Sequence, residues 1–225
     1  MICQIGYSLF RIRNYLFPFL YLTLFIQSPR IGPSSLMAFT GILLIISGIC
    51  IRSVTIGLEY IVRGGKNRQI HAEGLIIGGI YEICRNPMYL GNLIILAGFG
   101  FLANSLIFVL FVFPFLMLIY LSIIKAEEDF LNKKFGEMYL VYKMDTPMLF
   151  PRLRLLLQIV YYKKLDFKRI LRKEYNSWYL YFSGILLLLF NGRFITTSVF
   201  LSFFSFLTIL WIMVRICKKK SCLNA

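Results

Sequence analysis

The 225-residue sequence is poor in the residues that most often carry out chemistry in proteins. It contains one histidine and five cysteines, and no two cysteines form a CxxC pair. Because structural and catalytic metal sites usually combine Cys and His ligands at short spacing, we predict no metal site, and we interpret His71 as an ordinary loop residue. The glycine-rich stretches at 64–67 and 98–103 lack the remaining residues of a phosphate-binding loop or a dinucleotide fingerprint.

Charged residues are also scarce, and apolar residues replace them. Only 16% of the chain is charged and 59% is hydrophobic, with a mean hydropathy of +0.74. Soluble domains contain about 25% charged and 45–50% apolar residues, so this composition excludes an ordinary soluble domain. It is typical of a protein embedded in the lipid bilayer.

Long segments without any charge define the expected membrane helices. These segments cover residues 14–29, 31–51, 86–124, 175–192 and 194–214. A helix needs about 20 apolar residues to cross the hydrocarbon core, so the 39-residue segment predicts a hairpin of two helices that turns at residues 103–105. We therefore predict an all-α, polytopic helical membrane protein with about six transmembrane helices. The first segment is short and contains Pro18, so a re-entrant or interfacial segment is an alternative there.

The basic residues predict the orientation in the membrane. The net charge is +15, and 23 of the 25 Lys and Arg residues lie at the N-terminus, in the loops 52–85 and 125–174, or in the C-terminal tail. All ten acidic residues lie in the same two loops. The positive-inside rule then predicts a multi-pass protein with both termini and the polar loops in the cytoplasm. The basic excess indicates this topology and attraction to anionic lipid in the bilayer, rather than binding to nucleic acid.

Two cytoplasmic loops flank the predicted hairpin, and each contains a dense group of polar and aromatic residues. Because both ends of a hairpin emerge on the same side, Arg85 should lie near Glu127 and Glu128. Ionisable groups at the membrane edge are costly and tend to be functional. An ordinary Arg–Glu pair that closes the hairpin is the alternative interpretation.

The two loops carry the motifs GxYxxxRNPMYLG at residues 79–91 and EExxLxxxFGxxYxxY at residues 127–142. Taken together, in this order and at this spacing, they resemble the isoprenylcysteine carboxyl methyltransferase family and its bacterial phospholipid-methyltransferase-like relatives. The resemblance covers roughly residues 50–152. It implies a helical membrane enzyme that uses S-adenosyl-L-methionine without a Rossmann domain.

The resemblance also implies the site residues. The cofactor-binding positions would be Lys66, Glu73, Gly74, Leu75, Ile76, Tyr81, Asn86, Pro87, Met88, Tyr89 and Glu127. Arg85 and Glu128 would be the catalytic residues. The chain would then divide into N-terminal membrane helices (1–52), a methyltransferase core (53–152), and a basic amphipathic connector with a C-terminal membrane hairpin (153–225).

The residue types suit this chemistry. Methyl transfer from a sulfonium is a direct displacement, which requires alignment and a suitable electric field but no metal and no covalent nucleophile. Pro87 has no N–H and fits the first turn of a helix, where Asn86 can cap the helix or bind the cofactor. Arg85 can orient an anionic group.

The sequence departs from the family at two positions. Asn86 replaces the histidine of the prenylcysteine enzymes, and Ile123 occupies the position of the arginine that engages the substrate carboxylate there. The acceptor is therefore predicted only as a lipid-like or lipidated small substrate. A sterol-type reductase using NADPH shares part of the first motif, but such enzymes usually carry Glu where this chain has Asn92. A non-catalytic membrane protein would predict ionisable groups within the spans, and we expect none.

Overall fold

A computed structural model describes residues 2–59, 70–152 and 164–219, and these residues form helices and loops with no β-strand. The predicted all-α fold is confirmed for this part of the chain. The helices are α1 (Ile2–Tyr21), the 3-10 helix η1 (Leu22–Phe25), α2 (Ser34–Leu58), α3 (Ile80–Ile83), α4 (Pro87–Leu102), the π-helical turn η2 (Phe108–Val112), α5 (Phe113–Phe135), α6 (Glu137–Asp145), α8 (Phe167–Asn191) and α9 (Thr197–Lys219).

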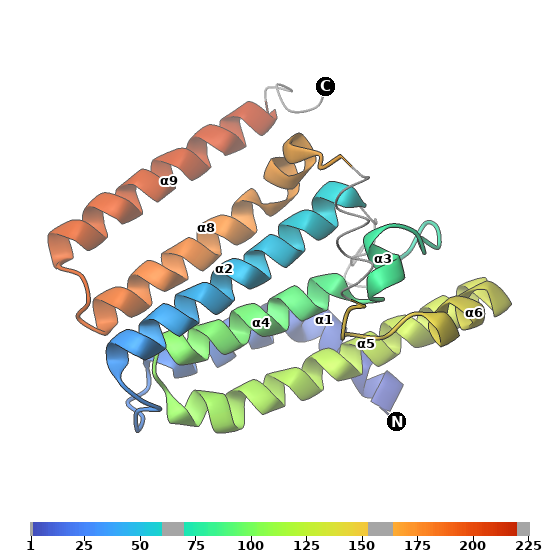
Figure 1. The fold of residues 1–225 in the computed structure, drawn as a ribbon, viewed down its shortest axis with the longest axis horizontal. Helices are drawn as coiled ribbons and strands as arrows, with labels where there is room; N and C mark the ends of the chain where they lie inside the picture. The colour runs from blue at the N-terminus through green and yellow to red at the C-terminus, as the bar shows by residue number, and fades with distance from the viewer. Residues whose placement is uncertain (1, 60–69, 153–163, 220–225) are drawn as a thin grey trace.

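The long helices lie side by side with similar axis directions (Figure 1). From one edge the order is α9, α8, α2 and α4, and α5 and α1 lie beyond α4. The helices with membrane-type composition thus form a bundle in which α4 is near the centre.

Glycines make the contact between α2 and α4 unusually close. A Cβ atom at Gly41 would lie 2.7 Å from the carbonyl oxygen of Gly98, and a Cβ at Gly48 would lie 2.7 Å from that of Gly91. Apolar side chains gain little by leaving lipid for another apolar surface, so membrane helices associate largely through close van der Waals packing of small residues. These two glycine pairs fix α2 against the helix that begins at the Arg-Asn-Pro tripeptide.

The predicted turn of the hairpin is present between α4 and η2. Asn104 has a φ of +50°, and its side-chain oxygen accepts hydrogen bonds from the backbone N–H groups of Ile31 and Gly32 at 2.8 and 3.2 Å. Its amide nitrogen donates to the Gly32 carbonyl at 2.9 Å. Asn tolerates this left-handed conformation, and its side chain satisfies backbone groups of the loop before α2.

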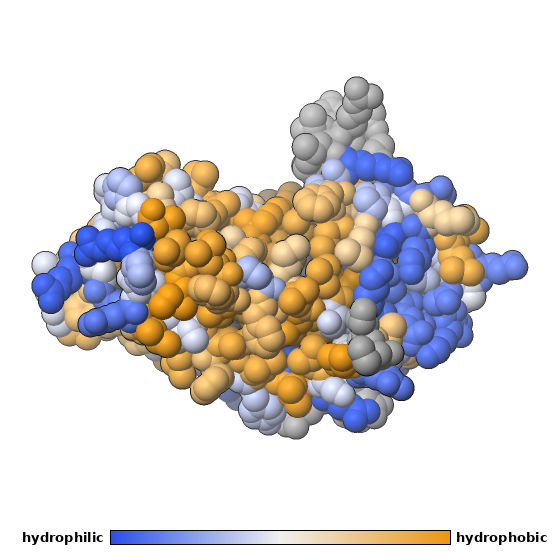
Figure 2. Space-filling view, turned by 90° about the horizontal axis from the view of Figure 1, so that it is seen from below, coloured by the Kyte–Doolittle hydropathy of each residue, from blue (hydrophilic) through white to orange (hydrophobic). Residues whose placement is uncertain are grey.

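Figure 2 shows apolar side chains in a band across the middle of the visible face, with hydrophilic residues at both ends. Among the described residues, three helices are long and apolar enough to cross a membrane: Ser34–Leu58, Phe108–Phe135 and Thr197–Lys219. The shorter apolar helix Pro87–Leu102 adds to them. A membrane protein is therefore supported, whereas the number of six spans stays a prediction.

The first and last predicted segments differ in detail from the sequence analysis. The first helix does not cover residues 14–29, because α1 begins at Ile2 and ends at Tyr21, shortly after Pro18. Part of the predicted connector (residues 153–163) lies outside the described residues, and α8 already begins at Phe167. The last residues of the predicted connector, from Phe167 onward, therefore form the first turns of α8, the same helix that contains the apolar segment after residue 175.

One end of the bundle carries α3, α6, the start of α8 and the end of α9 (Figure 1). The turns between α4 and η2 and between α8 and α9 lie at the other end. Both predicted functional loops thus lie at one end of the bundle. Which side of the membrane this end faces stays a prediction.

Candidate active site

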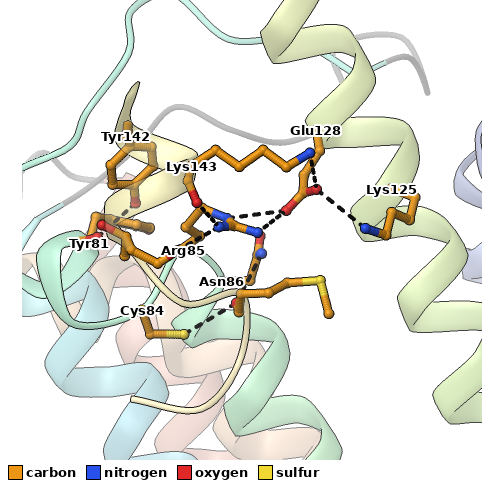
Figure 3. Close-up of polar contacts among 10 residues, drawn as sticks. Tyr81, Cys84, Arg85, Asn86, Lys125, Glu128, Tyr142 and Lys143 are labelled. Atoms are coloured by element: carbon orange, nitrogen blue, oxygen red, sulfur yellow. Dashed lines mark hydrogen bonds and ion pairs between the residues drawn. The ribbon is translucent and has the colours of Figure 1, made fainter. Parts of the chain in front are cut away.

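Arg85 lies at the centre of a buried polar cluster just before α4 (Figure 3). Its Nε and Nη2 donate to Glu128 Oε1 at 3.2 and 2.8 Å, and Nη1 donates to the carbonyls of Lys143, at 2.7 Å, and Thr146. The predicted proximity of Arg85 to the Glu-Glu pair is therefore found. The guanidinium joins the start of α4, the C-terminal half of α5, and the last turn of α6 with the residue that follows it.

Glu128 is surrounded by cations. Only 3% of the residue is exposed, and its Oε2 lies 3.1 Å from Lys143 Nζ and 3.8 Å from Lys125 Nζ, in addition to the Arg85 contact at Oε1. The two lysine side chains are about half exposed, so water weakens their attraction to the carboxylate. The pair with Arg85 is buried on both sides and is the principal contact.

The residues next to Arg85 bind the segment that follows α6. Asn86 occupies the N-cap position of α4, but its side chain does not cap the helix; its Nδ2 donates to the Met148 carbonyl at 3.2 Å. The Cys84 thiol donates to the carbonyls of Met148 and Leu149. Burial raises the pKa of the Cys84 thiol to about 11, although the backbone of Asn86 and the charge of Arg85 lower it. Cys84 is therefore a protonated structural thiol at neutral pH and not a nucleophile.

The Phe-Gly and Tyr positions of the second motif fold α6 back onto α3. Gly136 has a φ of +54°, a backbone conformation that glycine adopts without strain, and it ends α5 and begins α6. The turn buries Tyr139, and Tyr142 donates its hydroxyl to the Tyr81 carbonyl at 2.7 Å. The motif thus supports the loop that carries Tyr81.

Glu127 has different surroundings from its neighbour Glu128. It accepts a hydrogen bond from the hydroxyl of Tyr89 at 2.6 Å, and the Tyr89 ring packs edge-on against Tyr120 at a centroid distance of 5.6 Å. Successive residues of a helix point about 100° apart, so adjacent positions face different neighbours. Glu128 faces the Arg85 cluster, whereas Glu127 faces a cavity.

This cavity has a volume of about 820 Å³ and lies among α1, α2, α4, α5 and α8. Its lining includes seven of the predicted site residues: Tyr81, Arg85, Asn86, Pro87, Met88, Tyr89 and Glu127. Away from these residues the lining is mainly apolar and aromatic. The two sequence motifs therefore meet at one end of a cavity that continues between apolar helices.

Four further predicted site residues in the described segment 70–152, together with Glu128, are not among the residues that line the cavity. Glu73 and Gly74 are exposed, whereas Leu75 and Ile76 pack against the cluster of buried side chains around Tyr81 and Tyr139. Glu128 does not line the cavity itself, but it forms an ion pair with Arg85, which does. Lys66 lies outside the described residues.

A second buried ion pair, which is not predicted from the sequence, lies at the cavity. Arg52 donates to both oxygens of Glu174, at 3.0 and 2.7 Å, and also to Asn92. Arg52 and Asn92 line the cavity, and only 8% of Arg52 is exposed. Arg52 follows the predicted charge-free segment 31–51, and α2 continues past it to Leu58, so the charge lies within the same helix as that segment. A carboxylate on another helix pairs with the charge and offsets the cost of burial.

Residues 36–138 match the phospholipid methyltransferase family, which confirms the resemblance seen in the two motifs. The chain is 34% identical to the cobalt-zinc-cadmium resistance protein CzcN of Cupriavidus metallidurans over 94 residues, which are 42% of this chain and 41% of that protein. It is 32% identical to the nickel-cobalt-cadmium resistance protein NccN of Alcaligenes xylosoxydans xylosoxydans over 81 residues, which are 36% of this chain and 38% of that protein. The chain thus spans about two fifths of the length of these curated relatives. No solved structure matches it.

Proposed function

We propose that the protein is an integral membrane methyltransferase that uses S-adenosyl-L-methionine to methylate a lipid-like or lipidated acceptor. The observation that carries the proposal is a cavity that the tripeptide and Glu127 line at one end. The rest of its lining is mainly apolar and aromatic, with Arg52 and Asn92 among the polar exceptions. The family match supports the reaction class. The cofactor, the acceptor and the roles of individual residues are part of the proposal.

The cavity residues fit the proposed cofactor. About 820 Å³ is within the range of pockets that bind small molecules and cofactors. Glu127 offers a carboxylate to a cation or a hydroxyl group, and Asn86 offers an amide. The rings of Tyr81, Tyr89 and Tyr120 offer faces that attract positive charge. When bound, the cofactor supplies a methyl group on a positively charged sulfur.

The polar cluster prepares this end of the cavity. Arg85 and Glu128 join three segments, and this fixes Asn86 and Glu127 relative to each other. A bimolecular displacement gains most from such fixed alignment, because the entropy of orientation is lost before the reaction. Since Arg85 already donates to Glu128 and to two carbonyls, we assign Arg85 and Glu128 as positioning residues. The family resemblance instead implies a catalytic role for both residues, and that role stays a prediction.

Binding of the cofactor can be tested on detergent-purified protein. Calorimetry should detect binding of S-adenosylhomocysteine and no binding of NADPH. Glu127→Gln should weaken the binding of S-adenosylhomocysteine by about 1.5–3 kcal/mol, because a charge-assisted hydrogen bond is lost. Binding of NADPH alone would instead favour a membrane reductase. Unchanged affinity in Glu127→Gln would remove this residue from the site.

Transfer can be tested separately with labelled S-adenosylmethionine and membrane lipid extract. We expect label in the lipid fraction, which mass spectrometry then identifies. Cofactor binding without any labelled lipid or lipidated product would refute the proposed acceptor class while leaving the cofactor assignment intact.

A further inference from the structure

We propose that helix α8, which lies outside the family match at residues 36–138, selects the acceptor by forming one wall of a channel for a single hydrocarbon chain. The proposal rests on the proposed function, because the channel continues from the polar end of the same cavity. One face of α8 contributes the wall: Leu180, Tyr181, Gly184, Leu187 and Leu188. None of these five lining residues belongs to the region that matches the family.

Aromatic rings from three helices line the cavity where α4 faces α8. The Phe99 ring of α4 lies 6.5 Å from Tyr21 of α1 and 6.5 Å from Tyr181 of α8, measured between ring centroids. A Cβ atom at Gly184 would lie 3.1 Å from the Phe99 ring. A larger side chain at position 184 would displace the Phe99 ring or extend into the cavity that both residues line, so Gly184 leaves room for the ring in the cavity wall.

The Arg52–Glu174 pair holds α8 in this place. The two side chains form a bidentate contact between α2 and α8, and Ser177 lies 3.5 Å from Arg52 Nη2. The exposed fractions of the Arg52 and Glu174 side chains are 10% and 3%. Planar bidentate pairs fix orientation as well as distance, so this contact sets the position of the α8 wall relative to α2.

The lining determines the class of occupant. Leu180 and Leu187 line the cavity and are nevertheless 66% and 40% exposed, so the channel is open along α8. These leucines lie in the part of α8 that belongs to the charge-free segment 175–192, which we predict from the sequence to cross the membrane, so lipid would surround them there. A polar occupant would lose hydration there without gaining hydrogen bonds, whereas a hydrocarbon chain loses nothing. The occupant that fits is therefore the apolar chain of a lipid-like molecule.

Photocrosslinking tests the channel without any need for turnover. The protein is reconstituted in phosphatidylcholine nanodiscs with a phospholipid that carries a diazirine in one palmitoyl chain, and crosslinked residues are mapped by mass spectrometry. We expect label on Phe99 in the wild type and a loss of about tenfold in Gly184→Leu, since that side chain fills the channel. Label on the exposed face of α9 serves as the internal reference and should not change. Wild-type protein with labelled α9 and no labelled Phe99, or equal labelling of Phe99 in Gly184→Leu, would overturn the proposal.

A pair of neighbouring leucines gives a second test. Leu187 lines the channel and Leu186 does not. In the transfer assay with phosphatidylethanolamines of defined chain length, Leu187→Ala should shift the preference between chain lengths by about tenfold, as expected for one altered contact in an apolar pocket, whereas Leu186→Ala should not. Equal shifts in both variants would contradict the role of α8. No transfer in the wild type to these lipids or to membrane lipid extract, with crosslinking to Phe99 intact, would refute the proposed acceptor class and not the channel.

Discussion

The adjacent glutamates make the sharpest prediction, because the structure gives them different tasks. Glu128→Gln removes the charge that neutralises Arg85, whereas Glu127→Gln changes a residue of the cavity wall. We expect the first change to lower the stability of the protein and the second to lower cofactor affinity. The two substitutions are chemically identical, so each serves as the control for the other.

The expected size of the Glu128 effect follows from its contacts. Removing one partner of a buried ion pair typically costs about 3–5 kcal/mol, because the remaining charge is left without compensation. The carboxylate also attracts Lys125 and Lys143, but these half-exposed lysines contribute less than about 1 kcal/mol each. The loss in Glu128→Gln should thus come mainly from Arg85. For a chain of this length it corresponds to a fall in melting temperature on the order of 10 °C.

The assay is thermal unfolding in one detergent for wild type, Glu128→Gln, Glu127→Gln and Glu137→Gln. Glu137 is exposed in the first turn of α6, so its variant controls for the loss of a negative charge in general. A second control is Arg85→Lys, because lysine keeps the charge but cannot reach Glu128 and two carbonyls at once. Its stability should fall between those of wild type and Glu128→Gln.

One result would refute this reasoning. If Glu128→Gln melts within about 2 °C of the wild type, the cluster does not hold the loops together and the buried pair contributes no net stability. If it melts normally and loses turnover with cofactor binding intact, Glu128 is catalytic, as the family resemblance implies. Loss of stability with normal turnover per folded molecule would leave the positioning role in place.

Three further predictions address other parts of the molecule. Glu174→Gln should lower the stability by about 3–5 kcal/mol in the same melting assay. The double variant Glu174→Leu with Arg52→Met should recover most of the lost stability, because no charge is then left unpaired. Equal melting temperatures of the single and the double variant would contradict this explanation. In native protein at pH 7.5, Cys84 should react with N-ethylmaleimide far more slowly than it does in denatured protein. The reaction should become faster as the pH approaches the Cys84 pKa of about 11, since the thiolate is the reactive form. Rapid labelling of Cys84 in native protein at neutral pH would refute its burial. In whole cells, an impermeant thiol reagent should label Arg193→Cys but label Lys133→Cys only after permeabilisation, and the reverse pattern would invert the predicted topology.

The sequence alone determined the membrane character and the proximity of Arg85 to the pair Glu127 and Glu128. Charge-free segments of helix-spanning length require burial in lipid, and a hairpin necessarily brings its two ends together. These conclusions depend on local patterns, so no knowledge of distant packing was needed. The same reasoning could not establish that Asn86 contacts Met148 rather than capping its helix, since that choice depends on where the segment after α6 lies.

Only the tertiary structure decided which side chains face the cavity. Glu127 and Glu128 are identical and adjacent in sequence, and the rotation of about 100° between neighbouring helix positions turns one to Tyr89 and the other to Arg85. Arg52 and Glu174 are 122 residues apart, and no local pattern links them. They meet because paired glycines hold α2 against α4 while α8 packs on the other side of α2. Packing between helices remote in sequence depends on the complementary shapes of whole helix faces, and these shapes exist only once the chain has folded.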